Sequence, residues 1–316
     1  MKRKVVVNLE PEGYSDKAKM LLSEHFDYIE CSEINDNKDI LKKANGIISR
    51  LNHQLDEEFL KNSNALEFLA TATTGTNHID TDFTNANQIQ VISLKGEVEF
   101  LKRITPTAEH TWGLLISLLR NYKFHLRNVE SRNWDRDSQY GTQLLGKTIG
   151  IIGLGRLGLM VADYAKCFGM NVIYNDIESR DHWAKSVSLD VLMRTSDIIS
   201  VHVPLNTDTE KMLSIDEFDV MKDGVFLVNT ARGEIIDESA LMESLKSGKV
   251  AGAALDVLSG EKKWRGVVPS DNHLVEWAIQ NTNLIVTPHI GGACPDAMRM
   301  TEEFVASKII QHYTKI

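Results

Sequence analysis

Three glycines at fixed spacing give the sequence its first chemical signal. Gly153, Gly155 and Gly158 follow the apolar run Thr148–Ile152 and open a helical pattern. In such a segment the first glycine allows a tight turn, the second lets the backbone approach a pyrophosphate, and the third allows helix and strand to pack closely. The exposed N–H groups and the helix dipole then hold the anion. A glycine-rich turn without a ligand is the alternative, but the strand before it and the helix after it favour dinucleotide binding.

An acidic residue ends the next apolar run. Asp176 stands about 20 residues after the first glycine, where a carboxylate accepts hydrogen bonds from the adenosine ribose hydroxyls. It would repel a 2′-phosphate, Asn175 beside it is not a cation, and Glu178 adds negative charge. The sequence therefore predicts NAD rather than NADP. The alternative is that Asp176 caps an ordinary helix.

Polar residues also follow four later predicted strands, in the segments Val201–Leu205, Val228–Gly233, Leu255–Glu261 and Thr287–Gly292. These contain, in order, Val-His-Val-Pro, Asn-Thr-Ala-Arg-Gly, Leu-Asp-Val and Pro-His-Ile-Gly-Gly. With these motifs the chain resembles the D-isomer-specific 2-hydroxyacid dehydrogenases, a family that includes D-lactate, D-glycerate and D-3-phosphoglycerate dehydrogenases. The resemblance runs from about Gly46 to Ala306 and is densest between Gly150 and Gly292.

The resemblance implies a catalytic triad of Arg232, Glu261 and His289. Histidine suits the acid–base role because it titrates near neutrality, and a carboxylate partner would orient the imidazole and favour its protonated form. The planar guanidinium of Arg232 fits a substrate carboxylate and can polarise the 2-oxo group. A turn histidine at a strand end and a surface arginine are the alternatives. They are weakened by the presence of all three residues in order.

The segment after Glu261 departs from the family pattern. The family usually places proline directly after this glutamate, whereas this chain has Lys262. The insertion 262–275 is also longer and more basic than usual. Glu261 nevertheless keeps its expected distance from Asp256, so we retain it as the partner of His289.

The resemblance also implies which residues bind the cofactor, with Asp256 facing the nicotinamide carboxamide and His202 lining the cofactor rather than acting as the acid–base. His110, in Ala-Glu-His-Thr, matches a helix element expected at a hinge or interface. The complete set expected to bind the cofactor is Gly153, Gly155, Arg156, Leu157, Gly158, Asp176, His202, Val203, Pro204, Thr230, Ala231, Arg232, Asp256, His289, Gly291 and Gly292.

The substrate set combines Arg232 and His289 with the N-terminal residues Thr74 and Gly75, whose segment matches a family loop that binds the substrate carboxylate through backbone N–H groups. Arg50 follows the predicted strand Gly46–Ser49. It either binds a distal phosphate or carboxylate of the substrate or forms a surface ion pair, and the sequence leaves both open. A departure from the family at 94–103 blurs the substrate further.

Short apolar runs alternate with helical patterns on both sides of residue 104, which predicts parallel sheets covered by helices. The expected fold is α/β, with two doubly wound domains. Residues 1–103 with 291–316 form a flavodoxin-like substrate domain of at least four strands, and residues 104–290 form a six-stranded Rossmann domain. The apolar helix Thr107–Asn121 is expected between domains or subunits. The last helix, Ala297–Tyr313, can return to the N-terminal domain.

Composition narrows the class of protein. The 316 residues are 42% hydrophobic, which excludes a disordered chain, and the net charge of −9 does not favour nucleic-acid binding. Three scattered cysteines without Cys-x-x-Cys indicate a cytoplasmic protein and no metal site. No run approaches the roughly 18 apolar residues of a membrane span. Because the sequence ends at Ile316, an appended regulatory domain is not expected.

The sequence thus predicts an NAD-dependent oxidoreductase that transfers a hydride between nicotinamide and C2 of a D-2-hydroxyacid/2-oxoacid pair. The small-molecule substrate is expected between two domains whose closure excludes water. By resemblance the protein forms a homodimer through the nucleotide domain. Glyoxylate or hydroxypyruvate reduction and, more remotely, phosphite oxidation stay open. The alternative from another class is an NAD-sensing corepressor-like scaffold with little catalysis.

Overall fold

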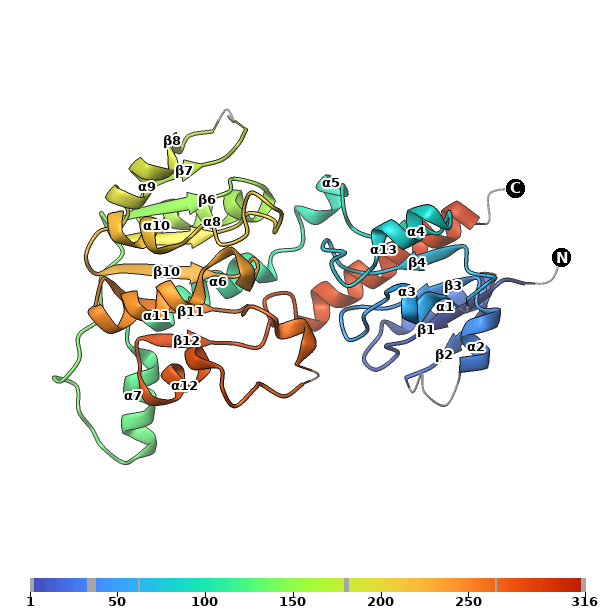
Figure 1. The fold of residues 1–316 in the computed structure, drawn as a ribbon, viewed down its shortest axis with the longest axis horizontal. Helices are drawn as coiled ribbons and strands as arrows, with labels where there is room; N and C mark the ends of the chain where they lie inside the picture. Colours follow the sequence, from blue (N-terminus) through green and yellow to red (C-terminus); the bar gives the residue numbers. More distant parts are fainter. Residues whose placement is uncertain (1–2, 33–37, 62, 179–181, 265, 314–316) are drawn as a thin grey trace. The chain divides into compact units, whose positions relative to one another are not determined.

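The chain divides into two compact α/β units in a computed structural model that describes residues 3–32, 38–61, 63–178, 182–264 and 266–313. Unit 1 comprises Met1–Ile104 and Ala293–Ile316, and unit 2 comprises Thr105–Gly292. Figure 1 shows the helices and strands of each unit. Among the described residues no helix is both long and apolar enough to cross a bilayer.

Unit 1 contains a five-stranded parallel sheet in the order β2-β1-β3-β4-β5, which is the flavodoxin-like order. Its strands are β1 (Val5–Asn8), β2 (Asp27–Glu30), β3 (Gly46–Ile48), β4 (Phe68–Ala70) and β5 (Gln90–Ile92). Its helices are α1 (Asp16–His25), α2 (Lys38–Lys43), α3 (Glu57–Leu60), α4 (Thr81–Ala86), α5 (Val98–Leu101) and α13 (Pro295–Tyr313). Val6 and Val7 are fully buried in different core clusters, as expected for a sheet covered on both faces.

The C-terminal helix α13 belongs to unit 1, as the sequence predicted. It packs along α1, which Ser15 caps through its side chain. Glu302 of α13 is fully buried and accepts a hydrogen bond from the Ser15 backbone N–H at 2.7 Å. This contact joins the two ends of the sequence within one unit.

Unit 2 contains a seven-stranded parallel sheet in the order β12-β11-β10-β9-β6-β7-β8. Its strands are β6 (Thr148–Ile152), β7 (Asn171–Asn175), β8 (Lys185–Ser186), β9 (Ile198–Val201), β10 (Val225–Asn229), β11 (Val250–Leu255) and β12 (Leu284–Val286). Its helices are α6 (Pro106–Leu119), α7 (Tyr122–Glu130), α8 (Arg156–Cys167), α9 (Leu189–Thr195), α10 (Ile215–Val220), α11 (Glu238–Ser247) and α12 (His273–Gln280), with 3₁₀ turns η2 (Gly233–Ile235) and η3 (Glu261–Lys263). The strand order reverses between β6 and β9, and nucleotides bind at such a point.

The predicted fold class is confirmed, with two corrections to the strand counts. The prediction of six strands for unit 2 omitted β8, and the strands named for the N-terminal domain omitted β5. Both are short, and the two residues of β8 are exposed, so neither produces the apolar run by which a parallel strand is recognised.

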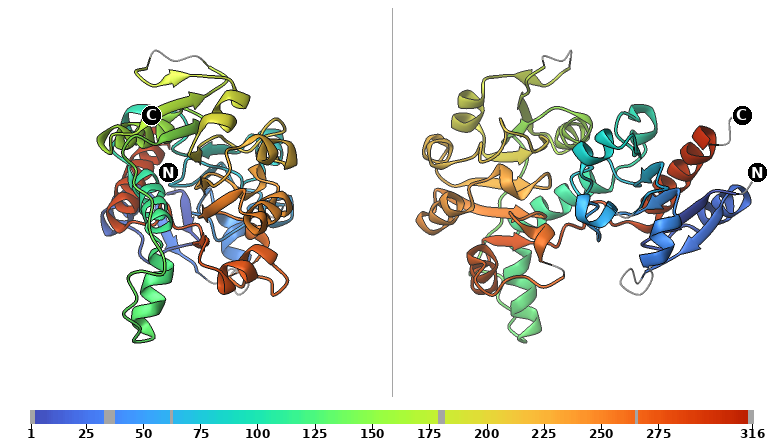
Figure 2. Two further views of the ribbon diagram at one scale, coloured as in Figure 1. Left: turned by 90° about the vertical axis from the view of Figure 1, so that its left-hand side faces the viewer. Right: turned by 45° about the vertical axis from the view of Figure 1, so that its right-hand side comes forward.

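The apolar helix α6 is buried inside unit 2, which changes the meaning of its composition. Leu115 and Leu119 pack in one core cluster, and Leu114 and Leu118 pack in another, against β10 and β11. Its apolar sides are therefore covered within the chain, and a subunit interface is not needed to explain them. By contrast, α7 and the loop after it extend away from the rest of unit 2 (Figure 2).

Candidate active site

The glycine-rich turn after β6 has a conformation and surroundings that require glycine. Gly153 has φ of +89°, and a Cβ there would lie 2.8 Å from the His202 carbonyl oxygen. A Cβ on Gly158 would lie 2.1 Å from the Gly153 carbonyl oxygen. At Gly155 a Cβ would meet no atom within 4 Å, so this position is open at the start of α8. The turn thus provides the open helix N-terminus that a pyrophosphate needs.

Arg156 and Leu157 form the first turn of α8, and both are half-buried. Burial lowers the pKa of the Arg156 guanidinium. A cation beside an open glycine turn favours an anion there. This geometry fits the phosphate part of a dinucleotide.

Asp176 follows β7 and lies beside the same turn. Its Oδ2 accepts a hydrogen bond from Leu154 N at 2.7 Å, and its Oδ1 accepts one from Glu178 N at 3.0 Å. The described residues after it, Ile177 and Glu178, form a bend and not a helix. The helix-cap alternative is therefore not what the structure shows, and the carboxylate is positioned next to the glycine turn.

His202 follows β9 and contributes a buried ring nitrogen. Its Nε2 lies 2.7 Å from Ser200 Oγ, and its Nδ1 is buried with no hydrogen-bond partner among the described residues. Burial lowers the pKa of His202 to about 4, so the ring is neutral at physiological pH. The unpaired nitrogen lies in the segment whose backbone packs against Gly153, with Val203 and Pro204 directly after it. This position is compatible with the predicted role of His202 in lining the cofactor, which stays a prediction.

The neutral state of His202 makes stability depend on pH. An unfolded histidine takes up a proton near pH 6.5, whereas folded His202 stays neutral until the pH falls through about 4. The free energy of unfolding therefore decreases as the pH falls from 6.5 to 4, by about 3 kcal/mol in all, and changes little through this group below pH 4. Urea unfolding at pH 7 and pH 4.5 should show a smaller decrease for His202→Gln than for the wild type. An equal decrease in both would contradict this assignment.

Arg232 lies in the turn that follows β10. Asn229 is fully buried; its Oδ1 accepts from Ala231 N at 2.9 Å and its Nδ2 donates to the Arg232 carbonyl at 2.8 Å. Thr230 Oγ1 lies 2.8 Å from Thr111 Oγ1 on α6. These contacts fix the turn and leave the Arg232 side chain half-buried.

The surroundings of Arg232 suit an anionic ligand. Burial lowers the pKa of the Arg232 guanidinium, while the charges of Glu261 and Glu234 oppose that effect. Because a half-buried cation is stabilised by a negative charge beside it, the Arg232 guanidinium is suited to bind a carboxylate.

Glu261 and His289 form a hydrogen-bonded pair that joins the segments after β11 and β12. The turn η3 carries Glu261 after β11, and His289 follows β12. His289 Nδ1 is hydrogen-bonded to Glu261 Oε1, while Glu261 Oε2 accepts from Leu258 N at 3.1 Å. Since Glu261 occupies Nδ1, Nε2 is the ring nitrogen that can exchange a proton with a substrate. Lys262, in place of the usual proline, is exposed and does not prevent this pairing, and Arg265 of the insertion lies outside the described residues.

Asp256 holds the loop that presents His289, a role that the sequence did not suggest. The residue is 1% exposed. Its carboxylate accepts from Thr287 Oγ1 at 2.6 Å, Ile290 N at 2.9 Å and Gly291 N at 2.8 Å. Its carbonyl accepts from His289 N at 2.8 Å. His289 has φ of +54°, which is uncommon for a residue with a Cβ, and these bonds stabilise that conformation.

His110 of α6 completes this cluster within unit 2, where its Nε2 lies 3.2 Å from Asp256 Oδ1 and 3.1 Å from Thr287 Oγ1. Gly291 packs tightly here, since a Cβ would lie 3.0 Å from Asp256 Oδ2, whereas Gly292 is exposed. The carboxamide contact expected of Asp256 stays a prediction. The sequence offered one clue to the hydrogen bonds of Asp256, because Thr287 and Asp256 each directly follow a predicted strand.

Three predicted substrate residues, Arg50, Thr74 and Gly75, lie in unit 1. Arg50 Nη2 donates to the carbonyls of Glu10 at 3.1 Å and Glu12 at 2.7 Å. The same guanidinium lies 3.7 Å from the Glu10 carboxylate and 3.5 Å from that of Glu302. These contacts favour an ion pair for Arg50 over binding of a distal substrate group. The pair is not at the surface as expected, because the side chains of Glu10 and Glu302 are 4% and 1% exposed. Thr74 is exposed and Gly75 half-buried in the turn after β4, which a bond from Thr73 Oγ1 to the Gly75 carbonyl closes at 2.7 Å.

The predicted triad and most predicted cofactor residues therefore follow strand ends of one sheet. The carboxyl ends of parallel strands meet at the same edge, and β6, β7, β9, β10, β11 and β12 each supply a segment. The hydrogen bonds join β11 to β12 through Glu261 and His289 and through Asp256 and its partners. This edge can bind a dinucleotide and hold a proton donor and a guanidinium beside it.

Comparison with known proteins assigns the family. Residues 112–291 match the model of the NAD-binding domain of D-isomer specific 2-hydroxyacid dehydrogenases. The chain belongs to this family, and unit 2 contains its NAD-binding domain.

Two curated relatives illustrate the range of the family. D-3-phosphoglycerate dehydrogenase of Bacillus subtilis is 33% identical over 94% of this chain and 55% of its own length. Hydroxypyruvate reductase of Thermotoga maritima is 32% identical over 92% of this chain and 89% of its own length. The chain thus spans about half the length of the curated phosphoglycerate dehydrogenases that it matches.

A solved structure matches nearly the whole chain. D-lactate dehydrogenase of Aquifex aeolicus, crystallised with NAD and lactic acid, is 30% identical with a TM-score of 0.85, covering 99% of this chain and 96% of its own. The similarity extends over both units.

Proposed function

We propose that the protein is an NAD-dependent oxidoreductase that interconverts a D-2-hydroxyacid and its 2-oxoacid. The observation that carries this proposal is the pairing of His289 with Glu261 beside Arg232, at the strand edge that also carries the glycine turn. Bound NAD would supply or accept the hydride. Of the alternatives, the corepressor-like scaffold is not favoured, because the relatives and structural neighbours are named as dehydrogenases and reductases.

Each member of the triad has a distinct task in this proposal. Arg232 binds the substrate carboxylate and polarises the 2-oxo group. His289 gives a proton from Nε2 to the 2-oxygen during reduction and takes it back during oxidation. Glu261 is hydrogen-bonded to Nδ1 and so orients the ring. Thr74 and Gly75 as further substrate contacts, and closure of the domains over the substrate, stay predictions.

The direct test is the oxidation of NADH by the purified protein with a panel of 2-oxoacids. The panel spans glyoxylate, pyruvate, hydroxypyruvate, 3-phosphohydroxypyruvate, 2-oxoglutarate and branched 2-oxoacids. We expect turnover with at least one member. Tight NADH binding without turnover of any member would contradict the proposal and support the scaffold alternative.

Cofactor choice tests Asp176. The carboxylate beside the glycine turn should accept from ribose hydroxyls and repel a 2′-phosphate. We expect Asp176→Ala to weaken NADH binding and to reduce the preference for NADH over NADPH by about tenfold or more, as for the loss of a charge-assisted hydrogen bond. Fluorescence titration with both cofactors measures this. Glu243→Ala is the control, because Glu243 is an exposed carboxylate on α11 that pairs with Lys246. An unchanged preference in Asp176→Ala would refute the assignment.

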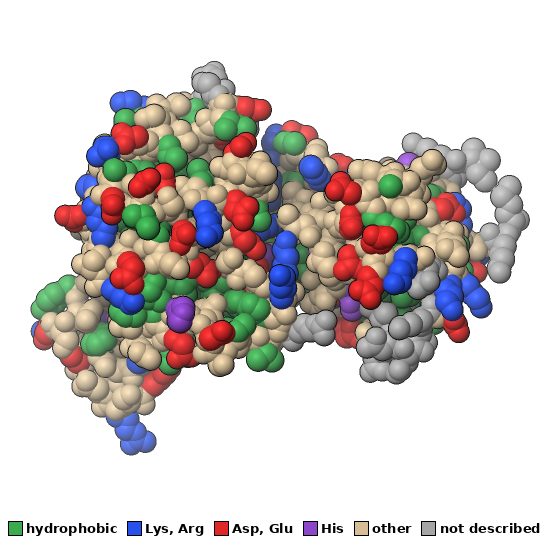
Figure 3. All heavy atoms as spheres, viewed as in Figure 1, with side chains coloured by type: hydrophobic (Ala, Val, Ile, Leu, Met, Phe, Trp, Pro, Cys, Tyr) green, Lys and Arg blue, Asp and Glu red, His purple; other side chains and the backbone are tan. Residues whose placement is uncertain are grey.

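We also propose that two chains form a homodimer through an arm comprising residues 122–145. Its exposed apolar side chains include Leu126 at 61%, Trp134 at 87% and Tyr140 at 76%, which is unusual for a surface facing water. The face of unit 2 seen in Figure 3 carries small groups of hydrophobic side chains among acidic and basic ones. The cytoplasm stays the proposed location, because the three cysteines are scattered along the sequence.

Light scattering should therefore give twice the 35.5 kDa mass of one chain. We expect Trp134→Asp with Tyr140→Asp to yield a monomer, because buried charges without partners destabilise an interface. Ile215→Asp is the matched control, since Ile215 is 65% exposed but lies on α10, outside the arm. A monomeric wild type, or a double variant that stays dimeric, would rule out this interface.

A further inference from the structure

The turn that carries Glu261 is held by three carboxylates. Three successive backbone N–H groups, at residues 258, 259 and 260, each donate to a glutamate side chain. The acceptors are Glu261 at 3.1 Å, Glu238 at 2.6 Å and Glu234 at 3.4 Å, in that order. Gly260, with φ of +76°, ends the turn just before Glu261. The direction of the Glu261 side chain therefore depends on how this short turn is anchored.

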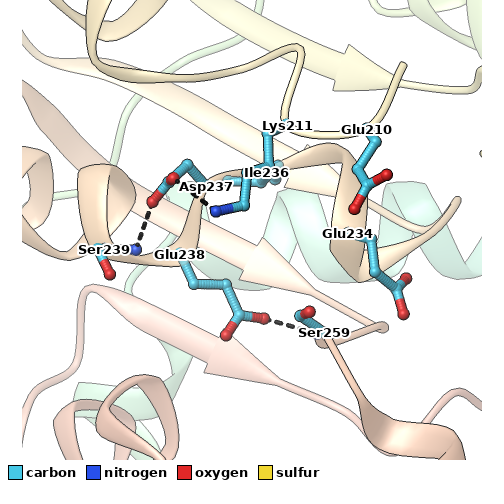
Figure 4. Close-up of a pocket in the computed structure, with 8 residues that line it drawn as sticks. All are labelled: Glu210, Lys211, Glu234, Ile236, Asp237, Glu238, Ser239 and Ser259. Carbon is cyan, nitrogen blue, oxygen red and sulfur yellow. Dashed lines mark hydrogen bonds and ion pairs between the residues drawn. The ribbon is translucent and has the colours of Figure 1, made fainter. Parts of the chain in front are cut away.

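Glu238 supplies the shorter of the two anchors that come from outside the turn. It begins α11, directly after the capping residue Asp237. Figure 4 shows its side chain reaching to Ser259 across a pocket, while Asp237 turns to Lys211 and to the N–H of Ser239. The anchor of the turn is thus separate from the cap of the helix.

Glu238 is half-buried among other carboxylates. Burial raises the pKa of the Glu238 carboxyl, and the negative charges of Glu234, Asp237 and Glu261 raise it further. The Ser259 N–H lowers that pKa and so stabilises the carboxylate. A half-buried carboxylate surrounded by like charges is costly unless its hydrogen bond is kept. The hydrogen bond to Ser259 N therefore couples the Glu238 carboxylate to the 258–260 turn.

We propose that Glu238 is a positioning residue for the Glu261–His289 pair, holding the 258–260 turn so that Glu261 points at His289 Nδ1. The inference rests on the proposed function of that pair. Glu238 acts through Glu261, since its carboxylate contacts the turn and not His289. Groups that orient a partner of a reactive residue typically change activity about 10-fold to 100-fold when they are removed.

Substitutions at Glu238 separate the anchor from a general effect on α11. Glu238→Ala removes the acceptor, whereas Glu238→Gln keeps an oxygen that can accept from Ser259 N–H. We expect Ala to lower kcat about tenfold or more with NADH affinity unchanged, and Gln to restore most of that loss. Glu243→Ala is the matched control on the same helix, because Glu243 is 74% exposed and pairs with Lys246. Glu238→Met replaces the Ala variant if that variant does not fold.

A double-mutant cycle tests whether Glu238 acts through Glu261. In a Glu261→Gln background, Glu238→Ala should cause almost no further loss of kcat, because the group that it positions is already absent. Losses that multiply would show that the two residues act independently and would overturn the proposal.

A measurement without turnover keeps this inference separate from the proposed function. The ¹⁵N resonances of the His289 ring, assigned by their loss in His289→Asn, can be followed in the protein without substrate. We expect Glu238→Ala to shift them and Glu243→Ala to leave them in place. If the wild type reduces no 2-oxoacid, the proposed function fails while this shift still decides the role of Glu238. Unchanged resonances in Glu238→Ala would refute it.

Discussion

Replacing His289 by Asn should lower kcat for 2-oxoacid reduction by about 10³-fold while leaving NADH binding intact, since positioned acid–base groups contribute roughly 10²–10⁴-fold. His289 has φ of +54°, and asparagine tolerates this left-handed conformation better than most residues. The loop held by Asp256 can therefore keep its shape in the variant. The loss then reports on the imidazole itself.

Steady-state kinetics and NADH fluorescence titration measure the two quantities separately. His273→Asn is the control, because His273 is an exposed histidine of unit 2 that begins α12 and belongs to no predicted site. We expect this control to keep most of the turnover. Comparable turnover in His289→Asn and the wild type would exclude His289 as the proton donor.

Replacing Gly233 by Ala should impair both stability and turnover. A Cβ at this position would lie 2.1 Å from the Leu258 carbonyl carbon and 2.3 Å from Ser259 N. Both are backbone atoms, so no side-chain rotation relieves the collision, and overpacking of this kind costs about 1–3 kcal/mol. Gly233 directly follows Arg232 and packs on the turn that leads to Glu261. Separating these segments by about 1 Å can reduce turnover by about 10²-fold.

Thermal unfolding and kinetics of one variant pair test this expectation. Gly113→Ala is the matched control, since a Cβ there meets no atom within 4 Å and the residue lies inside α6, where alanine is favoured. We expect the control to be as stable as the wild type or more so. Unimpaired turnover in Gly233→Ala would show that the spacing of the Arg232 and Glu261 segments is not critical.

The sequence predicted those features of the site that depend on residues close together along the chain. Gly153, Gly155 and Gly158 follow from backbone geometry at fixed spacing, which is legible without a structure. The two-sheet fold was predictable for the same reason, because buried parallel strands such as β6 and β9 produce apolar runs. The edge strand β8 has no such run, and its pairing depends only on its neighbour β7.

The features that the sequence did not show depend on contacts between distant segments. Arg50 stood open between a substrate role and an ion pair until its contact with Glu302 of α13 was seen. The role of Asp256 needs β12 beside β11, which brings Ile290 and Gly291 to its carboxylate. These contacts depend on which strands and helices pack side by side. The spacing of residues along the chain does not predict that packing.

The configuration of the product tests the central claim most directly. The purified protein would convert the best 2-oxoacid of the panel other than glyoxylate, whose product has no stereocentre, with NADH. Chiral chromatography would resolve the 2-hydroxyacid formed. A proton donor and a guanidinium fixed at one strand edge predict a single enantiomer, and membership of this family predicts the D form. Formation of the L enantiomer, of a racemate, or of no hydroxyacid from any panel member would contradict the account.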